Sequence, residues 1–159
     1  MSGRIKKFVF NTLTVEFHGD NIENIVIDSL NSSPNEIGGV ITGCYFCDNK
    51  KAIIKSFHGP TIDSVGTPYN YVRGKKGLSA LMQKLWKKNE YYLGEWHLHP
   101  FSLPTASNTD LTQILEISKM TQYRCPEPIL IIIGGDIKNL SYNVYLVINQ
   151  VVEKMEEIE

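Results

Sequence analysis

The chain has 159 residues and a formal net charge of −1; 42% of its residues are hydrophobic and 21% are charged. This length suits one domain with a buried core, and we expect a single domain over residues 1–159. A near-neutral charge excludes a global field that attracts nucleic acid or an anionic membrane.

The sequence also predicts a cytoplasmic protein. The longest apolar run, Ile129–Ile133, is far too short to cross a bilayer. The basic N-terminal residues are not followed by an apolar segment of signal-peptide length. We therefore expect no association with a membrane.

The pattern of apolar residues predicts a mixed order of strands and helices. In the first half we expect a strand over 8–17, a helix from Asp20 or Asn21 to Leu30, a strand over 36–46, a strand over 51–57 and a loop over 58–70. In the second half we expect a helix over 77–88, a strand over 91–97, a loop over 98–106, a helix from Ser107, strands over 129–133 and 142–148, and a frayed helix over 152–159. Strands outnumber helices, so we expect an α/β (mixed α+β) fold with a curved mixed sheet flanked by helices.

The three cysteines do not form a convincing site. An odd number is a poor disulfide framework, and Cys44 and Cys47 form a single C-x-x-C that no second pair completes as a zinc site. We interpret Cys44 and Cys47 as small residues at a strand end or hairpin, and no disulfide is expected among these two and Cys125.

One segment, Gly94–Asp110, has the residues of a metal site. His97 and His99 are one residue apart at a strand end, so their side chains lie on the same side of the strand. Seven residues then separate His99 from Ser107, and Asp110 follows in the first turn of the next helix. Two imidazoles and one carboxylate leave a fourth position for water, which is typical of catalytic zinc. Iron and manganese remain open as alternatives.

Each of these residues also has a purely structural interpretation. His97 by itself suits a buried strand histidine, and Ser107 with Asp110 matches a capping box at a helix N-terminus. Glu36 by itself is a strand-end carboxylate, yet it is also the best candidate for the proton acceptor that a hydrolase needs. The conjunction of all these residues favours the metal site, and the capping and catalytic roles are compatible.

These residues resemble the motif of the JAMM metallopeptidases, also called the JAB1/MPN or MPN+ family. Glu36-Ile-Gly-Gly resembles the glutamate strand of the family, and Gly94-Glu-Trp-His-Leu-His-Pro resembles the metal strand of its bacterial branch. The resemblance implies the cytidine-deaminase-like JAMM fold and one Zn²⁺ bound by His97, His99 and Asp110. It also implies Glu36 as general base and Ser107 as hydrogen-bond donor to the oxyanion.

The same resemblance implies a substrate class. Family members cut peptide or isopeptide bonds after the C-terminal residue of a ubiquitin-like tail, and small bacterial members accompany E1- and E2-like enzymes. The single-domain form resembles deconjugating peptidases of antiphage (CBASS-type) operons, whose conjugated partner is a cyclic-nucleotide synthase. Two alternatives remain: processing of a ubiquitin-like sulfur-carrier protein, and a non-catalytic scaffold of the same fold.

Other hydrolase classes are excluded by length and spacing. An amidohydrolase barrel needs about 250 residues, and a zinc deaminase needs H-x-E followed by P-C-x-x-C. Substrate contacts are expected from the loop before the second helix, with Tyr69, Tyr71 and Arg73 as candidates. Glu95 shares the side of His97 on the strand and is expected either to orient a ligand or to form a salt bridge.

Overall fold

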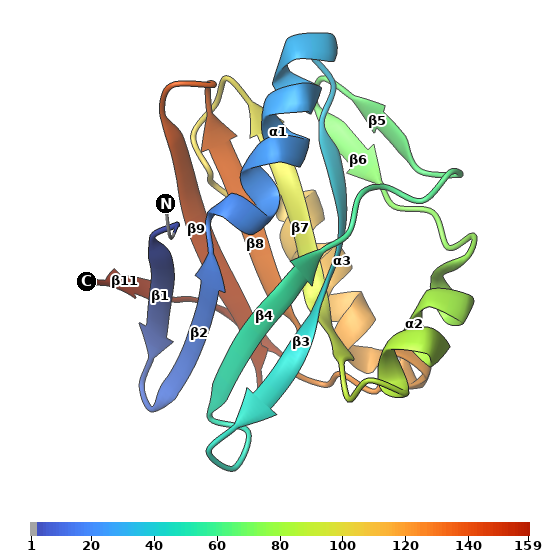
Figure 1. Cartoon of the computed structure of the whole chain (residues 1–159), viewed down its shortest axis with the longest axis vertical. Helices are drawn as coiled ribbons and strands as arrows, with labels where there is room; N and C mark the ends of the chain where they lie inside the picture. The colour runs from blue at the N-terminus through green and yellow to red at the C-terminus, as the bar shows by residue number, and fades with distance from the viewer. Residues whose placement is uncertain (1–2) are drawn as a thin grey trace.

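The protein is built on one large mixed sheet, seen in a computed structural model that describes residues 3–159 (Figure 1). The strands are β1 (Ile5–Phe10), β2 (Leu13–His18), β3 (Ile37–Phe46), β4 (Lys51–Phe57), β5 (Val65–Thr67), β6 (Asn70–Val72), β7 (Tyr91–Pro100), β8 (Ile129–Gly135), β9 (Leu140–Ile148), β10 (Val151–Lys154) and β11 (Glu156–Ile158). The helices are α1 (Asp20–Ser32), α2 (Leu78–Trp86), α3 (Asn108–Lys119) and the 3₁₀ turn η1 (Thr121–Tyr123).

Nine strands form the main sheet in the order β10-β9-β8-β7-β3-β4-β2-β1-β11. The pairs β2–β4 and β7–β8 are parallel, and the other neighbours are antiparallel. The remaining two strands, β5 and β6, pair only with each other and form a small separate hairpin. The mixed sheet flanked by helices confirms the predicted fold class.

Alternate side chains of the central strands enter two different cores. On β8, Ile129, Ile131 and Ile133 join the larger core, which also contains Ile22 and Val26 of α1. The intervening β8 residues, Leu130 and Ile132, join a smaller core with Ile114 of α3 on the opposite face. Figure 1 shows α1 in front of the sheet and α3 behind it. The two faces of β7 therefore also meet different surroundings.

Three expectations about local structure were wrong. Residues 8–17 are not one strand, because Asn11 takes a left-handed conformation and turns β1 back into β2. Residues 58–70 are not all loop, because they contain β5 and the start of β6. The tail is not helical: β10 folds back on β9 through Asn149 and Gln150, both of which have positive φ, and β11 pairs with β1.

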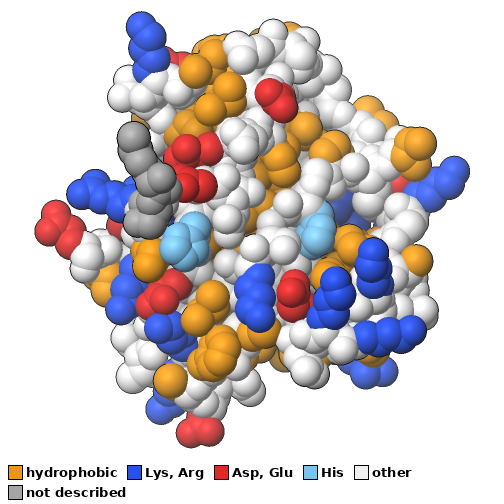
Figure 2. All heavy atoms as spheres, in the orientation of Figure 1, with side chains coloured by type: hydrophobic (Ala, Val, Ile, Leu, Met, Phe, Trp, Pro, Cys, Tyr) orange, Lys and Arg blue, Asp and Glu red, His pale blue; other side chains and the backbone are white. Residues whose placement is uncertain are grey.

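The α2 helix lies at the side of the molecule and is only lightly packed. Leu78 is its buried residue, and it contacts Val40, Tyr92 and Cys125. Lys and Arg side chains gather on this side of the surface (Figure 2). Among residues 3–159, no helix is both long and apolar enough to cross a membrane.

Candidate metal and catalytic site

The alternation of β7 separates the candidate ligands from the main core. Trp96 and Leu98 are fully buried in the larger core on the α1 side. Because successive side chains of a strand point to opposite faces, His97 and His99 point toward α3 instead. Both imidazoles are well shielded, with side-chain exposures of 5% for His97 and 11% for His99.

The N-terminus of α3 brings Asp110 to the two histidines. Ser107 is the N-cap, and its hydroxyl accepts a hydrogen bond from the Asp110 backbone N–H at 3.1 Å. In return, the Asp110 Oδ2 atom accepts one from the Ser107 backbone N–H at 2.8 Å. This reciprocal capping box, foreseen as the structural interpretation, fixes the carboxylate in a buried position.

Asp110 contacts one histidine with each of its oxygens. Oδ1 lies 3.0 Å from Nδ1 of His97, and Oδ2 lies 3.1 Å from Nε2 of His99. The structure thus brings together the three predicted ligands, which come from a strand and a helix separated by a loop. It also shows that the capping role and the position beside the histidines occur in the same carboxylate.

These contacts shift the protonation of the carboxylate and of one imidazole. Burial raises the pKa of Asp110, but the two histidines outweigh it and hold this pKa well below its usual range. Burial lowers the pKa of His99, whereas the carboxylates of Asp110 and Glu36 raise it by more, so the net direction is upward. Each of these two shifts favours the charged form of its own group.

Glu36 lies across from this cluster, directly before β3. Its Oε1 atom is 3.8 Å from His99 Nε2, and its side chain is 11% exposed. Burial raises the pKa of Glu36, and the negative charge of Asp110 raises it further. The two histidines lower this pKa, but the net shift is upward. The predicted proximity of Glu36 to the histidines is thus present in the fold, although the positions are distant in sequence.

Gly38 explains how the glutamate strand can approach the metal strand so closely. A side chain at this position would collide with the Trp96 carbonyl, the His97 ring and the Tyr71 ring. Gly38 therefore permits the close packing of β3 beside the site. Any larger residue at position 38 would push β3 or the ring of His97 out of place.

The donor set and one buried atom fit a bound cation. Nε2 of His99 is buried and makes no hydrogen bond to the described residues, although two carboxylates face it. Imidazole nitrogens and carboxylate oxygens are donors that zinc accepts, and Asp110 lies within 3.1 Å of a nitrogen of each histidine. Within residues 3–159, however, no set of three His, Cys, Asp or Glu side chains is arranged to hold a metal as it stands. Here Asp110 offers a different oxygen to each histidine.

The three candidate substrate residues lie in different environments. Tyr69 is 91% exposed at the turn of the β5–β6 hairpin. Tyr71 is buried, donates its hydroxyl hydrogen bond to the Gly38 carbonyl at 2.8 Å, and packs edge-on against His97 with ring centroids 5.2 Å apart. Arg73 is also held inside the protein. Of the three, Tyr69 presents its side chain to solvent.

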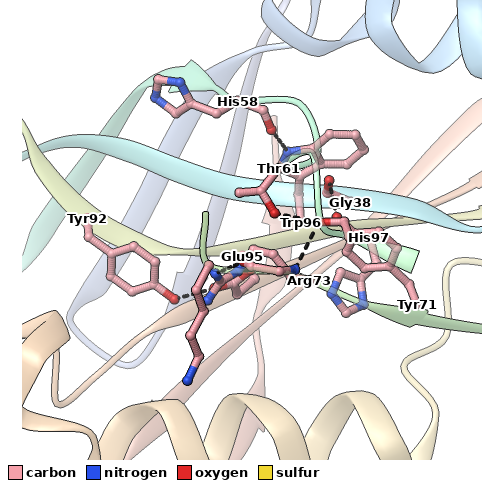
Figure 3. Close-up of polar contacts among 12 residues, drawn as sticks. Gly38, His58, Thr61, Tyr71, Arg73, Tyr92, Glu95, Trp96 and His97 are labelled. Carbon is pink, nitrogen blue, oxygen red and sulfur yellow. Dashed lines mark hydrogen bonds and ion pairs between the residues drawn. The ribbon is translucent and has the colours of Figure 1, made fainter. Parts of the chain in front are cut away.

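Glu95 forms a salt bridge, which was one of its two predicted roles. The Arg73 Nε atom donates to both Glu95 oxygens, at 3.0 and 2.7 Å, and the Tyr92 hydroxyl donates to Oε1 at 2.7 Å. Arg73 also donates to the Tyr123 hydroxyl at 2.6 Å. Figure 3 shows Arg73 and Glu95 between Tyr92 and His97. No local sequence pattern predicts this network, because Arg73, Glu95 and Tyr123 are far apart in the chain.

A cavity of 160 Å³ lies beside His97 and Asp110. It is lined by Arg73, Glu95, His97 and Asp110 together with apolar residues of α3.

The cysteines lie away from this site. Cys44 is in β3, Cys47 is in the following turn, and all three cysteines are free thiols. The cysteine interpretation from sequence is therefore consistent with the fold.

A mixed sheet of this order, with two strand histidines, a helix-capping aspartate and a facing glutamate, defines a domain of the JAB/MPN type. A profile of prokaryotic homologues of the JAB domain matches residues 19–145, and the chain belongs to this family. This confirms the resemblance seen in the motif.

The chain is similar to a named bacterial protein and to a solved structure. A protein of Enterobacter hormaechei subsp. hoffmannii (strain UCI 50), named CD-NTase/cGAS isopeptidase, is 36% identical over 123 residues, which cover 77% of this chain and 68% of that protein. The solution structure of protein DSY2949 from Desulfitobacterium hafniense superposes with a TM-score of 0.63 at 15% identity and covers 87% of each chain. The latter likeness concerns the fold alone.

Proposed function

We propose that this protein is a zinc-dependent isopeptidase that releases a conjugated protein from its target. The observation that carries the proposal is the position of Glu36, whose carboxylate faces His99 at 3.8 Å while Asp110 joins both histidines. A proton acceptor beside three potential ligands is the arrangement that metal-assisted amide hydrolysis requires.

His97, His99 and Asp110 would hold the metal. A zinc ion bound there would supply Lewis-acid polarisation of the scissile carbonyl and would make a water molecule acidic enough to attack near neutral pH. The chain's own contribution begins with orientation. The capping box fixes the Asp110 carboxylate, and the ring of Tyr71 packs against the ring of His97.

Glu36 would move the proton. Its carboxylate would accept a proton from the attacking water and donate it to the leaving amine, so that water and an amide become a carboxylic acid and an amine. Burial raises the pKa of Glu36, Asp110 raises it further, and the two histidines oppose the shift. A base at this position also needs no contact with the metal.

Ser107 would stabilise the oxyanion that forms on the scissile carbonyl. Its oxygen already accepts the Asp110 N–H, and its hydroxyl hydrogen remains available for donation to a substrate. A donor held on a helix N-cap is well preorganised, because the capping geometry restricts its rotation. The same residue thus serves stability and chemistry.

The name of the relative supports a proposal for the substrate class. The Enterobacter relative is named for a CD-NTase, so we propose a conjugated cyclic-nucleotide synthase of this kind as the partner. The bond cut would be the amide that joins its C-terminal residue to a target, made by E1- and E2-like enzymes. Members of the same family suggest a ubiquitin-like tail as the alternative substrate.

The test is cleavage of a purified CD-NTase conjugate, followed by gel shift and mass spectrometry. The native protein loaded with zinc is expected to release the free CD-NTase, and Glu36→Ala is expected to lose about 10²–10⁴-fold in rate. Zinc content measured by plasma mass spectrometry should be equal in both proteins, because Glu36 is not a ligand. Glu156→Ala, on strand β11, is the matched control and should cleave normally.

The same variant identifies the substrate in cells. Glu36→Ala should retain conjugates that the native protein releases, and mass spectrometry of the captured species names the modifier. A captured sulfur-carrier protein would favour the processing alternative. Equal turnover by native protein and Glu36→Ala would refute the assigned role of this residue, and absence of stoichiometric zinc would favour the scaffold alternative.

A further inference from the structure

The β5–β6 hairpin contacts both sides of the catalytic site, yet it has little to hold it. Each of its strands has three residues, and it pairs with no strand of the main sheet. An isolated two-stranded hairpin is marginally stable in water. Other contacts of the described chain must therefore fix its position.

The hairpin contacts Glu36, the proposed general base, through the backbone. The Glu36 N–H donates to the Thr67 carbonyl at 2.8 Å. Gly66 packs so closely on the Glu36 carbonyl that any side chain there would collide with it. The direction in which Glu36 leaves the chain therefore depends on where the hairpin sits.

The hairpin touches the ligand strand through Tyr71. The Tyr71 ring lies edge-on to His97, and its hydroxyl donates to the Gly38 carbonyl on the neighbouring strand. One hairpin thus contacts both the proposed base and a proposed ligand. A shift of the hairpin would disturb the two groups together.

A further anchor of the hairpin is the buried pair Arg73–Glu95. Arg73 follows β6 directly, and Glu95 is two residues before His97 on the same side of β7. Their side chains are 8% and 4% exposed, and Nε of Arg73 bridges both carboxylate oxygens. The Tyr92 hydroxyl donates to Glu95, as Figure 3 shows, and the Tyr123 hydroxyl accepts from Arg73.

Stability alone does not account for such a pair. Desolvation of two buried charges offsets much of their attraction, and an apolar pair of similar size is often as stable or more so. What an apolar pair does not supply is a fixed geometry, since the planar guanidinium accepts few arrangements with a carboxylate. The pair fixes one position of β6 against β7.

We propose that Arg73 and Glu95 are positioning residues that hold the β5–β6 hairpin in place, and through it orient Glu36 and His97 for the reaction. The effect on the reaction rests on the function proposed above, whereas the effect on the hairpin does not. Displacement of reacting groups by about 1 Å can cost 10²-fold in rate. Loss of the pair should therefore lower kcat and leave KM nearly unchanged.

The test compares Glu95→Gln with the double variant Arg73→Met/Glu95→Met. Hydrogen exchange of backbone amides is measured in the zinc-loaded proteins, together with Tm, kcat and KM. Exchange of the Glu36 amide and of residues 64–73 should speed up by about tenfold or more in both variants. We expect kcat to fall roughly 10–100-fold while KM stays within about twofold.

The double variant separates positioning from stability. It leaves no unpaired buried charge, so its Tm should return close to the native value while exchange and kcat remain changed. Glu95→Gln keeps the shape of the side chain, and it is the variant to measure if the double variant does not fold. Glu16→Gln is the control: it removes exposed ion pairs to Lys7 and Lys51 away from the site and should change none of these readouts.

Native exchange of the Glu36 amide and the hairpin in the double variant would overturn the proposal, whatever its activity. Fast hairpin exchange with native kcat would also overturn it, because positioning would then be irrelevant to the chemistry. If the native protein cleaves no conjugate, the proposed function fails. In that case the exchange data still decide whether Arg73 and Glu95 hold the hairpin.

Discussion

Two segments hold the candidate site from different sides, and they are stabilised in different ways. The start of α3 is fixed by a reciprocal bond between Ser107 and Asp110, which are three residues apart. The β5–β6 hairpin is fixed by contacts that reach across the chain, from Tyr71 to Gly38 and from Arg73 to Glu95. One side of the site is therefore encoded locally, and the other depends on the tertiary fold.

The two segments also differ in burial. Asp110 is buried at the helix start, whereas much of the hairpin surface faces solvent, with Val65 and Tyr69 well exposed. Local opening is easier where few apolar groups are buried. We therefore expect substitutions at the helix start to affect metal binding directly, and substitutions in the hairpin to act through smaller changes in position.

The largest effect on the local side is expected from Asp110→Ala. It removes a proposed ligand and the capping carboxylate together, so zinc and cleavage should both be lost. The free energy of unfolding without metal should fall by about 0.5–2 kcal/mol, the usual cost of a lost cap. Plasma mass spectrometry and chemical denaturation measure the two effects.

The variant Asp110→Asn separates the loss of metal binding from the loss of stability. Its amide oxygen can still accept the Ser107 N–H, so most of the stability should return while zinc affinity remains weak. An Asp110→Ala protein that retains stoichiometric zinc and full activity would contradict its assignment as a ligand. Unchanged stability of the metal-free variant would contradict the capping contribution.

Substitutions of Ser107 test whether its helix-capping role can be separated from its proposed catalytic role. Ser107→Asn retains a good N-cap, so the free energy of unfolding should stay near the native value. It removes the hydroxyl donor, and kcat should fall by about 10²–10³-fold if that donor stabilises the oxyanion. Ser107→Ala should lose both stability and rate. Native kcat in Ser107→Asn would restrict this residue to capping.

The difference between the two segments explains what could be predicted from the sequence. His97, His99 and Asp110 were identified because strand alternation and a capping box are short-range patterns. Glu36 is proposed from the residues as the proton acceptor that a hydrolase needs, and the family resemblance supports it, although no local rule joins it to the histidines. Glu95 was placed on the correct face, but its partner Arg73 was proposed for substrate binding instead.

The errors in the fold have the same origin. The hairpin strands lie in a stretch rich in Gly, Pro, Ser and Thr, so their pairing has no strong local signal. The turns at Asn11 and at Asn149-Gln150 lack the glycine that usually marks a two-residue hairpin. The strand character of the tail follows from its pairing with β9 and β1, which only the tertiary fold provides.

A smaller effect is expected on the hairpin side from Tyr71→Phe. The ring keeps its place against His97, and only the hydrogen bond to the Gly38 carbonyl is lost. The free energy of unfolding should fall by about 0.5–1.5 kcal/mol, with faster amide exchange in the hairpin. Tyr69→Phe is the matched control, because its exposed hydroxyl makes no such bond to Gly38, and it should leave both readouts unchanged.

The smallest effect is expected from Asp63, which secures the base of the hairpin from the solvent side. Its carboxylate accepts hydrogen bonds from the backbone N–H groups of Lys75 and Lys76, at 3.0 and 3.1 Å. These bonds, that to Lys75 first, lower the pKa of Asp63 from 3.8 to about 2. Because the folded-state pKa is the lower one, the stabilisation is present above pH 3.8 and is lost as the pH falls through about 2.

Asp63→Ala should therefore weaken amide protection at Lys75 and Lys76 by a constant small factor from neutral pH down to about pH 4. Below that pH the difference from the native protein should shrink, because the native carboxylate becomes protonated. Asp136→Ala, which removes a similar turn contact to Lys138 between β8 and β9, should leave these amides unchanged. A native-to-variant difference that persists unchanged at pH 2 would show that the charge of Asp63 does not hold this end of the hairpin.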